Sequence, residues 1–204
     1  MAIYLVRHGR DDEGYRGGWS QRGLIEEGKQ QAKKLAAFLK REEHTFKVNR
    51  VMSSDLARAL ETAEKIGREL NVDVVETDHW RETNNGVLAG MPNEEADQKY
   101  PGLYYNSLEM DERFPGGESP NENFTRIKEA FEMECRGQIE SNHQDDVFIV
   151  THGGVINIIY HILKDKTWSN KNKKFPINYT SLHKIEYVKG KWVLTMENMT
   201  EHLE

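Results

Sequence analysis

The 204-residue sequence predicts a single three-layer α/β domain, in which a mixed and mostly parallel sheet carries helices on both faces beside a small cap region. Three observations predict this class. Strand-like apolar runs alternate with helical segments along most of the chain, which is typical of parallel sheets. Hydrophobic residues make up 37% of the chain, which argues for one packed core at this length. The last two strand-like runs flank Lys189-Gly190 and indicate a hairpin, so the sheet is expected to be mixed.

The elements follow the chain in strand, helix, strand order. The run after Met1 is apolar as far as Val6, and Val51 to Ala63 is typical of a strand, a polar turn and the opening of a helix. Ser119-Pro120-Asn121-Glu122 has capping-box spacing with proline at the first helical position, so a helix is expected to begin there. Strands are expected at 2–6, 48–52, 72–77, 146–151, 181–188 and 191–197, and helices at 25–42, 55–70, 93–99, 121–141 and 154–163.

No tandem repeat or long linker divides the chain, so residues 1–204 are interpreted as one domain with a cap insertion at about 83–117. A net charge of −6 argues against a general nucleic-acid binder. The single cysteine, Cys135, excludes an intramolecular disulfide and a cysteine-rich metal site. We find no signal peptide and no apolar segment of membrane-spanning length, so we expect a cytoplasmic protein without a membrane partner.

Two strand-like runs end in a histidine followed by glycine. Leu5-Val6-Arg7-His8-Gly9 lies near the start of the chain, and Val150-Thr151-His152-Gly153-Gly154 lies near its other end. The carboxyl ends of parallel strands are where open α/β sheets bind ligands. Each histidine taken alone is equally compatible with a packed or solvated structural residue, so the argument depends on further segments.

Arg58 supplies the third observation, because it is expected in the first turn of a helix. The N-terminus of a helix is partly positive and disfavours a cation, unless an anion binds there as well. A guanidinium could then hold a phosphate through two parallel hydrogen bonds. The alternative is a solvent-facing arginine paired with Asp55 or Glu61.

Together with two further segments, these three motifs resemble the histidine phosphatase superfamily of phosphatases and phosphoglycerate mutases along essentially the whole chain. The resemblance implies that His8 is the nucleophile that becomes phosphorylated, and that Glu82 is the proton donor. It also implies that the phosphoryl group is held by Arg7, Arg58 and His152, without a metal or cofactor. The motifs are Leu5 to Gly9, Ser53-Ser54-Asp55-Leu56-Ala57-Arg58-Ala59, Trp80-Arg81-Glu82 with Gly86, Pro115-Gly116-Gly117-Glu118-Ser119, and Val150 to Gly154.

The chemistry of these residue types agrees with the implied roles. Imidazole is nucleophilic when neutral, and neighbouring cations lower its pKa and keep it neutral. Two arginines and a cationic His152 are expected to stabilise the charge of phosphoryl transfer. Glu82 could donate a proton only in its protonated form, which a nearby phosphate dianion would favour; the alternative for Glu82 is a surface carboxylate in a polar turn.

Two departures from the family pattern bear on function. Phosphoglycerate mutases read Glu-Arg-His-Tyr-Gly where this chain has Glu82-Thr83-Asn84-Asn85-Gly86, which favours a phosphatase. The segment after Gly9 is short and lacks the usual phosphate-contacting Asn; Arg10 or Arg16 could replace it, or could pair with the acids at 11–13. Further substrate contacts are expected at Gly9, Arg16, Gly17, Gly18, Asn85 and Gly153.

Residues 83–117 carry many apolar and aromatic side chains, including Met91, Tyr100, Leu103 and Phe114. They could form a cap over the site that suits a partly hydrophobic leaving group, or simply pack a small helical subdomain.

The sequence therefore predicts a metal-independent phosphatase that acts on small organic phosphomonoesters and binds a phosphate ester or inorganic phosphate. Three alternatives stay open: a cofactor-dependent phosphoglycerate mutase, a non-catalytic phosphate-binding or interaction relative, and a metallohydrolase using His8, His152 and Asp11 or Asp12. A homodimer is also left open.

Overall fold

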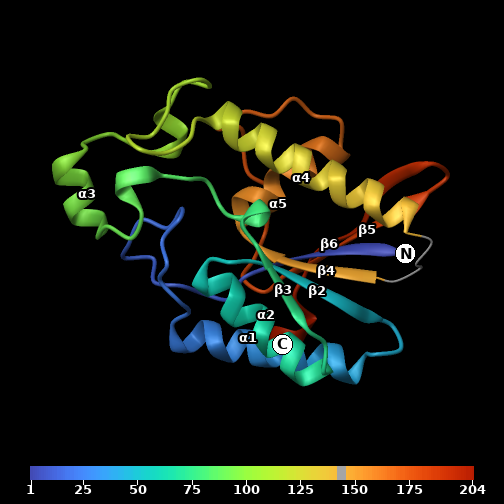
Figure 1. The fold of residues 1–204 in the computed structure, drawn as a ribbon. Coiled ribbons are helices and arrows are strands. Elements are labelled where there is room, and N and C mark those ends of the chain that lie inside the picture. The colour runs from blue at the N-terminus through green and yellow to red at the C-terminus, as the bar shows by residue number, and fades with distance from the viewer. Residues whose placement is uncertain (142–145) are drawn as a thin grey trace.

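The computed structural model describes residues 1–141 and 146–204, and it is built around one six-stranded sheet (Figure 1). The strand order is β3-β2-β4-β1-β5-β6. The first four strands in this order run parallel, whereas β5 and β6 run antiparallel to their neighbours. The strands are β1 (Ala2–Arg7), β2 (Val48–Ser54), β3 (Val74–Thr77), β4 (Asp146–Thr151), β5 (Leu182–Val188) and β6 (Lys191–Met199).

Helices cover both faces of the sheet, as predicted (Figure 1). One pair, α1 (Glu26–Arg41) and α2 (Ala57–Leu70), packs on one face, and α4 (Pro120–Glu140) and α5 (Gly153–Leu163) pack on the other. Alternate residues of β1 point to opposite faces, so Tyr4 packs in the core beneath α1 and α2, and Leu5 in the core beneath α4 and α5. The mixed three-layer α/β class is therefore confirmed.

The observed element boundaries lie close to the predicted ones. The capping box is present: the Ser119 hydroxyl accepts from the backbone N–H of Glu122, whose carboxylate accepts from the N–H of Ser119. The β5–β6 hairpin turns at Lys189 and Gly190, whose φ angles are 49° and 84°, as a two-residue hairpin turn requires.

Residues 83–117 lie at one end of the sheet and include α3 (Asn93–Lys99), which Figure 1 shows away from the main layers. They also contain the short 3-10 helices η2 (Gly86–Leu88) and η3 (Tyr105–Ser107). Their apolar side chains form a small core of their own around Leu88, Ala96, Leu108 and Phe114. The packing interpretation of this segment is therefore correct, and the site described below shows that some of these residues also line a cavity.

His183 on β5 makes the folded state sensitive to acid. It is fully buried, and burial lowers its pKa to about 3, well below the value of about 6.5 in an unfolded chain. As the pH falls below 6.5, the unfolded state takes up a proton that the folded state does not, so the free energy of unfolding should fall by about 1.4 kcal/mol per pH unit from this residue. Urea denaturation at pH 7.5, 6 and 5 measures the slope. His183→Gln should flatten the slope by that amount, and an unchanged slope would contradict the assignment.

Candidate active site

The ends of β1 and β4 bring the two predicted histidines together. The strands are parallel neighbours, with Arg7 opposite Thr151, so His8 and His152 leave the sheet side by side. Their ring centroids are 5.1 Å apart. Distant segments of the chain therefore converge at the carboxyl edge of the sheet, where a ligand is expected to bind.

The His8 ring is held as a neutral imidazole with a defined tautomer. Its Nδ1 lies 2.6 Å from the carbonyl oxygen of Gly9, which can only accept, so Nδ1 carries the proton. Nε2 then presents its lone pair, and Arg58 Nε donates to it at 3.3 Å. Burial, followed by the charges of Arg58 and Arg7, lowers the pKa of His8 well below 6.5. The ring is therefore neutral, as a nucleophile must be.

Arg58 lies in the first turn of α2 and is only 2% exposed. Its guanidinium donates to the carbonyl oxygens of Ser20 at 3.0 Å and Gly18 at 2.8 Å, so the loop after β1 fixes its direction. The alternative pairing with Asp55 or Glu61 is wrong.

Those two acids have other partners. Asp55 pairs with Arg81, which lowers the pKa of its carboxyl group, and Glu61 accepts from the backbone N–H of Leu24. The acid nearest to Arg58 is instead Asp11, with an oxygen 3.5 Å from Nε.

Arg7 is the second guanidinium at this point. Its Nη1 donates to the carbonyl oxygen of Ile177 at 2.7 Å, and its Cζ lies 3.8 Å from the centre of the Tyr179 ring. Within the part of the chain that the structure describes, its Nε is buried without a hydrogen-bond partner. The Nε–H group of Arg7 is therefore available to donate a hydrogen bond to a bound anion.

His152 is fully buried, and its Nε2 lies 2.9 Å from the hydroxyl oxygen of Ser54 at the end of β2. Its Nδ1 has no partner among the described residues. Burial, and then the charges of Arg58, His8 and Arg7, lower its pKa well below 6.5. Burial and the cations that would hold a phosphate therefore disfavour the protonated ring in the unliganded protein, so the expected positive charge on His152 stays a prediction for the phosphate-bound state.

Arg7, His8 and Arg58 line a cavity of about 250 Å³, here called the histidine cavity, whereas His152 lies beside His8 outside its wall. The N-terminus of α5 opens onto it at Gly153 and Gly154, so the partial charge of the helix adds to that of the arginines. Two guanidinium groups and a helix N-terminus form a site suited to a phosphoryl group. The cavity is lined by Arg7, His8, Asp11, Gly17, Gly18, Arg58, Glu82, Gly153, Gly154, Asn157, Lys174, Phe175 and Ile177.

Glu82 forms part of the wall of this cavity, so its interpretation as an ordinary surface carboxylate is wrong. One carboxylate oxygen accepts from the N–H of Thr83 and the other from that of Gly154, both at 3.1 Å. A Cβ at position 154 would lie 2.3 Å from the carboxylate, so a larger residue there would displace the Glu82 side chain. The backbone oxygen of Glu82 is held by Trp19 Nε1 at 2.7 Å and by Arg126. The carboxylate is therefore rigidly placed.

A second cavity of about 240 Å³, here called the cap cavity, adjoins the histidine cavity. Much of its wall comes from two segments: residues 83–117, and the connection between α5 and β5. The cap contributes Leu88, Leu103, Tyr104, Tyr105 and Phe114, and the connection contributes Trp168, Ser169, Asn170, Asn172 and Lys174. The cap residues therefore both pack together and line a hollow beside the histidines.

The six residues expected to make further substrate contacts differ in which cavity they line. Gly17, Gly18 and Gly153 line the histidine cavity, and Arg16 and Asn85 line the cap cavity. Gly9 lines neither. Its N–H donates to Thr62, and a Cβ there would lie 2.5 Å from the carbonyl oxygen of Gly28.

Neither candidate for the missing Asn reaches the histidine cavity. Arg10 is held at the surface by Glu13 and Glu27, each at 3.0 Å. Arg16 pairs with Asp97 at 2.5 Å, which is not one of the acids considered from the sequence. The segment supplies Asp11 to the cavity instead.

Sequence reasoning assigned no role to three residues at the site: Ser54, Asn157 and Lys174. Ser54 contacts His152, although it lies inside a motif that was recognised. Asn157 is the one polar residue in the apolar run Val155 to Ile159. Its isolation in an apolar helix is a sequence signal that could have identified it. Lys174 lies in an irregular segment whose sequence carries no such signal.

Within residues 1–141 and 146–204, no three histidine, cysteine or acidic side chains are grouped so as to hold a metal ion. In the same ranges, no helix combines the length and apolar character needed to cross a membrane.

Comparison with known proteins agrees with the geometry. The family model described as histidine phosphatase superfamily (branch 1) matches residues 3–200. The chain is 32% identical to phosphoglycerate mutase-like protein 4 of Arabidopsis thaliana, over 99% of this chain and 86% of that protein. It is 31% identical to the metal-independent phosphoserine phosphatase of the same plant, over 93% of this chain and 80% of that protein.

Solved structures share the fold. YhfR of Bacillus stearothermophilus aligns with a TM-score of 0.83 at 25% identity, covering 100% of this chain and 99% of that one. A mycobacterial glucosyl-3-phosphoglycerate phosphatase aligns with a TM-score of 0.76 at 24% identity, covering 98% and 99% of the two chains.

Proposed function

Since the chain belongs to the histidine phosphatase superfamily and is a phosphoric monoester hydrolase, we propose that it hydrolyses small organic phosphomonoesters through a phosphohistidine on His8, with Glu82 as proton donor. The observation that carries this proposal is the state of His8. A neutral ring with its Nε2 lone pair unprotonated lies against two guanidinium groups, and a carboxyl group lines the same cavity.

In the first step, His8 Nε2 attacks phosphorus and the bond from phosphorus to the ester oxygen breaks. The electron pair stays on the leaving oxygen, which takes a proton from the Glu82 carboxyl group. Arg7 and Arg58 stabilise the charge on the equatorial phosphoryl oxygens. A bound dianion also opposes the repulsion that keeps His152 neutral, so this ring can donate from Nδ1.

In the second step, water attacks phosphorus and the bond from phosphorus to Nε2 breaks. The water gives its proton to the Glu82 carboxylate, and His8 returns as a neutral ring with inorganic phosphate as product. Each of the two steps has a lower barrier than direct attack of water on the ester.

The segment after Glu82 favours hydrolysis over the mutase reaction. Thr83 accepts from Asn123, Asn84 holds the N–H of Gly86, and Asn85 accepts from the N–H of Trp19. These three side chains hold the loop together, and none of them provides a positive charge for a phosphorylated sugar acid. A binding protein without turnover would have no use for the orientation of His8 or Glu82.

The proposed reaction needs no metal, and chelation tests this. We expect the purified protein to hydrolyse para-nitrophenyl phosphate at the same rate before and after dialysis against EDTA, because arginines supply the positive charge. The measurement is nitrophenolate release, with phosphate release as a second readout. Loss of activity in EDTA, restored by a divalent cation, would favour the metallohydrolase alternative. Absence of activity with and without EDTA would favour the binding protein.

A further inference from the structure

The two cavities meet along a shared wall, which is where the ester bond of a substrate must lie. If the histidine cavity holds the phosphoryl group, the cap cavity holds the alcohol, and the residues common to both lie beside the ester oxygen and the first atoms of the alcohol. These common residues are Gly17, Gly18, Glu82, Gly154, Asn157 and Lys174. Among them, Asn157 and Lys174 are side-chain donors to which the proposed mechanism gives no role.

Asn157 presents an unused amide N–H₂ group at this wall. The side chain is 7% exposed, and its Oδ1 accepts from the backbone N–H of Phe175 at 3.1 Å. If the amide were flipped, its N–H₂ group would face the backbone N–H of Phe175, and both groups are donors. The contact therefore fixes Nδ2 as the free group. Over the described ranges Nδ2 makes no hydrogen bond to protein. This donor is therefore available at the cavity wall to a ligand that carries an acceptor.

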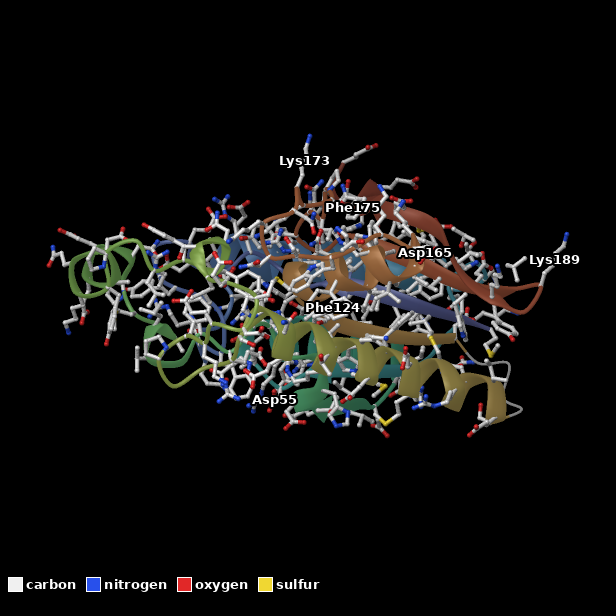
Figure 2. The ribbon with its side chains drawn as sticks, turned by 90° about the horizontal axis from the view of Figure 1, so that it is seen from above. Asp55, Phe124, Asp165, Lys173, Phe175 and Lys189 are labelled. Carbon is white, nitrogen blue, oxygen red and sulfur yellow. The ribbon has the colours of Figure 1, made fainter. Side chains whose placement is uncertain are left out.

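Lys174 adds a positive charge at the same wall. Across residues 1–141 and 146–204 its ammonium group is in no ion pair, whereas the other cation of the cap cavity, Arg16, is neutralised by Asp97 and lies over the Tyr104 ring. The neighbouring Lys173 points out from the body of the protein (Figure 2) and lines neither cavity. The chain therefore directs one of two adjacent lysines to the site.

We propose that Asn157 and Lys174 bind a carboxylate on the alcohol half of the substrate, close to the ester oxygen. A carboxylate has the acceptor oxygens that Asn157 Nδ2 needs and the negative charge that complements the Lys174 ammonium group. The inference rests on the proposed function, because it assumes that the phosphoryl group occupies the histidine cavity.

The remaining walls of the cap cavity define the rest of the alcohol. Leu88, Phe114 and Trp168 contribute apolar surface, and such walls bind an apolar or aromatic group. The substrate class is therefore a phosphomonoester of a hydroxy acid that also carries an apolar side group.

Phosphorylated 3-phenyllactate and its methyl ester form a matched pair of probes, because they differ only in the charge of the carboxyl group. We expect the wild-type protein to hydrolyse the acid with a kcat/KM at least 10-fold above that of the methyl ester. In Lys174→Ala this ratio should fall to about one. Lys173→Ala, which removes the adjacent lysine, should leave the ratio unchanged. Asn157→Asp keeps the acceptor for Phe175 and should reverse the preference, because a second carboxylate repels the acid.

Three results would overturn the inference. The first is a wild-type ratio near one, and the second is an equal loss on both probes in Lys174→Ala. The third is hydrolysis of para-nitrophenyl phosphate with neither phenyllactate ester turned over, which would leave the proposed function standing and reject this substrate class. A protein that hydrolyses none of the three compounds would reject both proposals together.

Discussion

Replacing His8 with alanine should abolish turnover, with kcat lowered by at least about 10⁴-fold, because the variant has no group to accept the phosphoryl moiety. The fold should survive. The ring makes one hydrogen bond to Gly9 and one to Arg58, and a buried imidazole facing two cations contributes little to stability. Initial rates on para-nitrophenyl phosphate and a thermal melt measure the two effects. His79→Ala, at an exposed histidine, is the control and should keep full activity.

Trapping the intermediate tests the same residue in a second way. Brief exposure to a substrate carrying labelled phosphate, followed by denaturation, should leave label on the wild-type chain that is lost in acid. The phosphate on nitrogen should map to the peptide containing His8, and the label should be absent from His8→Ala. Full activity in the variant, or label on another residue, would contradict the nucleophile assignment.

The convergence of the two histidines could be predicted because it follows from topology. Two runs that end in His8 and His152 must place them at one edge if the strands are parallel, and β1 and β4 prove to be neighbours. A role for Arg58 in anion binding could also be predicted from the sequence, since a cation in the first turn of a helix is unfavourable without an anion. Both inferences use only local structure and strand direction.

The ionisation of His152 could not be predicted from residue types. A histidine near a phosphate site suggests a cation, but in the structure the ring is fully buried and lies near Arg58, His8, Arg7 and Arg126. Its pKa depends on burial and on distances to Arg58 and Arg7, and neither is encoded in a motif. The same limit explains Arg16, whose partner Asp97 lies far along the chain, whereas the pairing of Arg10 with Glu13 was one of the two expected alternatives.

The cap illustrates why two alternatives can both hold. Leu88 and Phe114 belong to the small core of the segment, and they also line the cap cavity. A side chain in a thin layer has one face on its neighbours and another on the cavity, so packing and binding are not exclusive.

The place of Lys174 at the site could not be predicted for a different reason, because it comes from an irregular connection whose path is set by tertiary contacts.

Glu82→Gln should slow substrates with poor leaving groups far more than activated ones. An alkyl phosphate expels a strongly basic alkoxide that needs a proton, so its kcat should fall by about 10² to 10³-fold. Nitrophenolate leaves without help, and its rate should fall by less than about 10-fold. Glutamine has nearly the shape of glutamate and keeps a carbonyl to accept from Thr83 or Gly154, so the loop should stay in place.

Paired kcat values for propyl phosphate and para-nitrophenyl phosphate measure the difference. Glu64→Gln makes the same substitution at an exposed position of α2 that lines neither cavity, and it serves as a control for general effects. An equal loss on both substrates in Glu82→Gln would show that the carboxylate positions the phosphoryl group. Proton donation would then have to come from Asp11, the other acid lining the histidine cavity, and Asp11→Asn should then reproduce the dependence on leaving group.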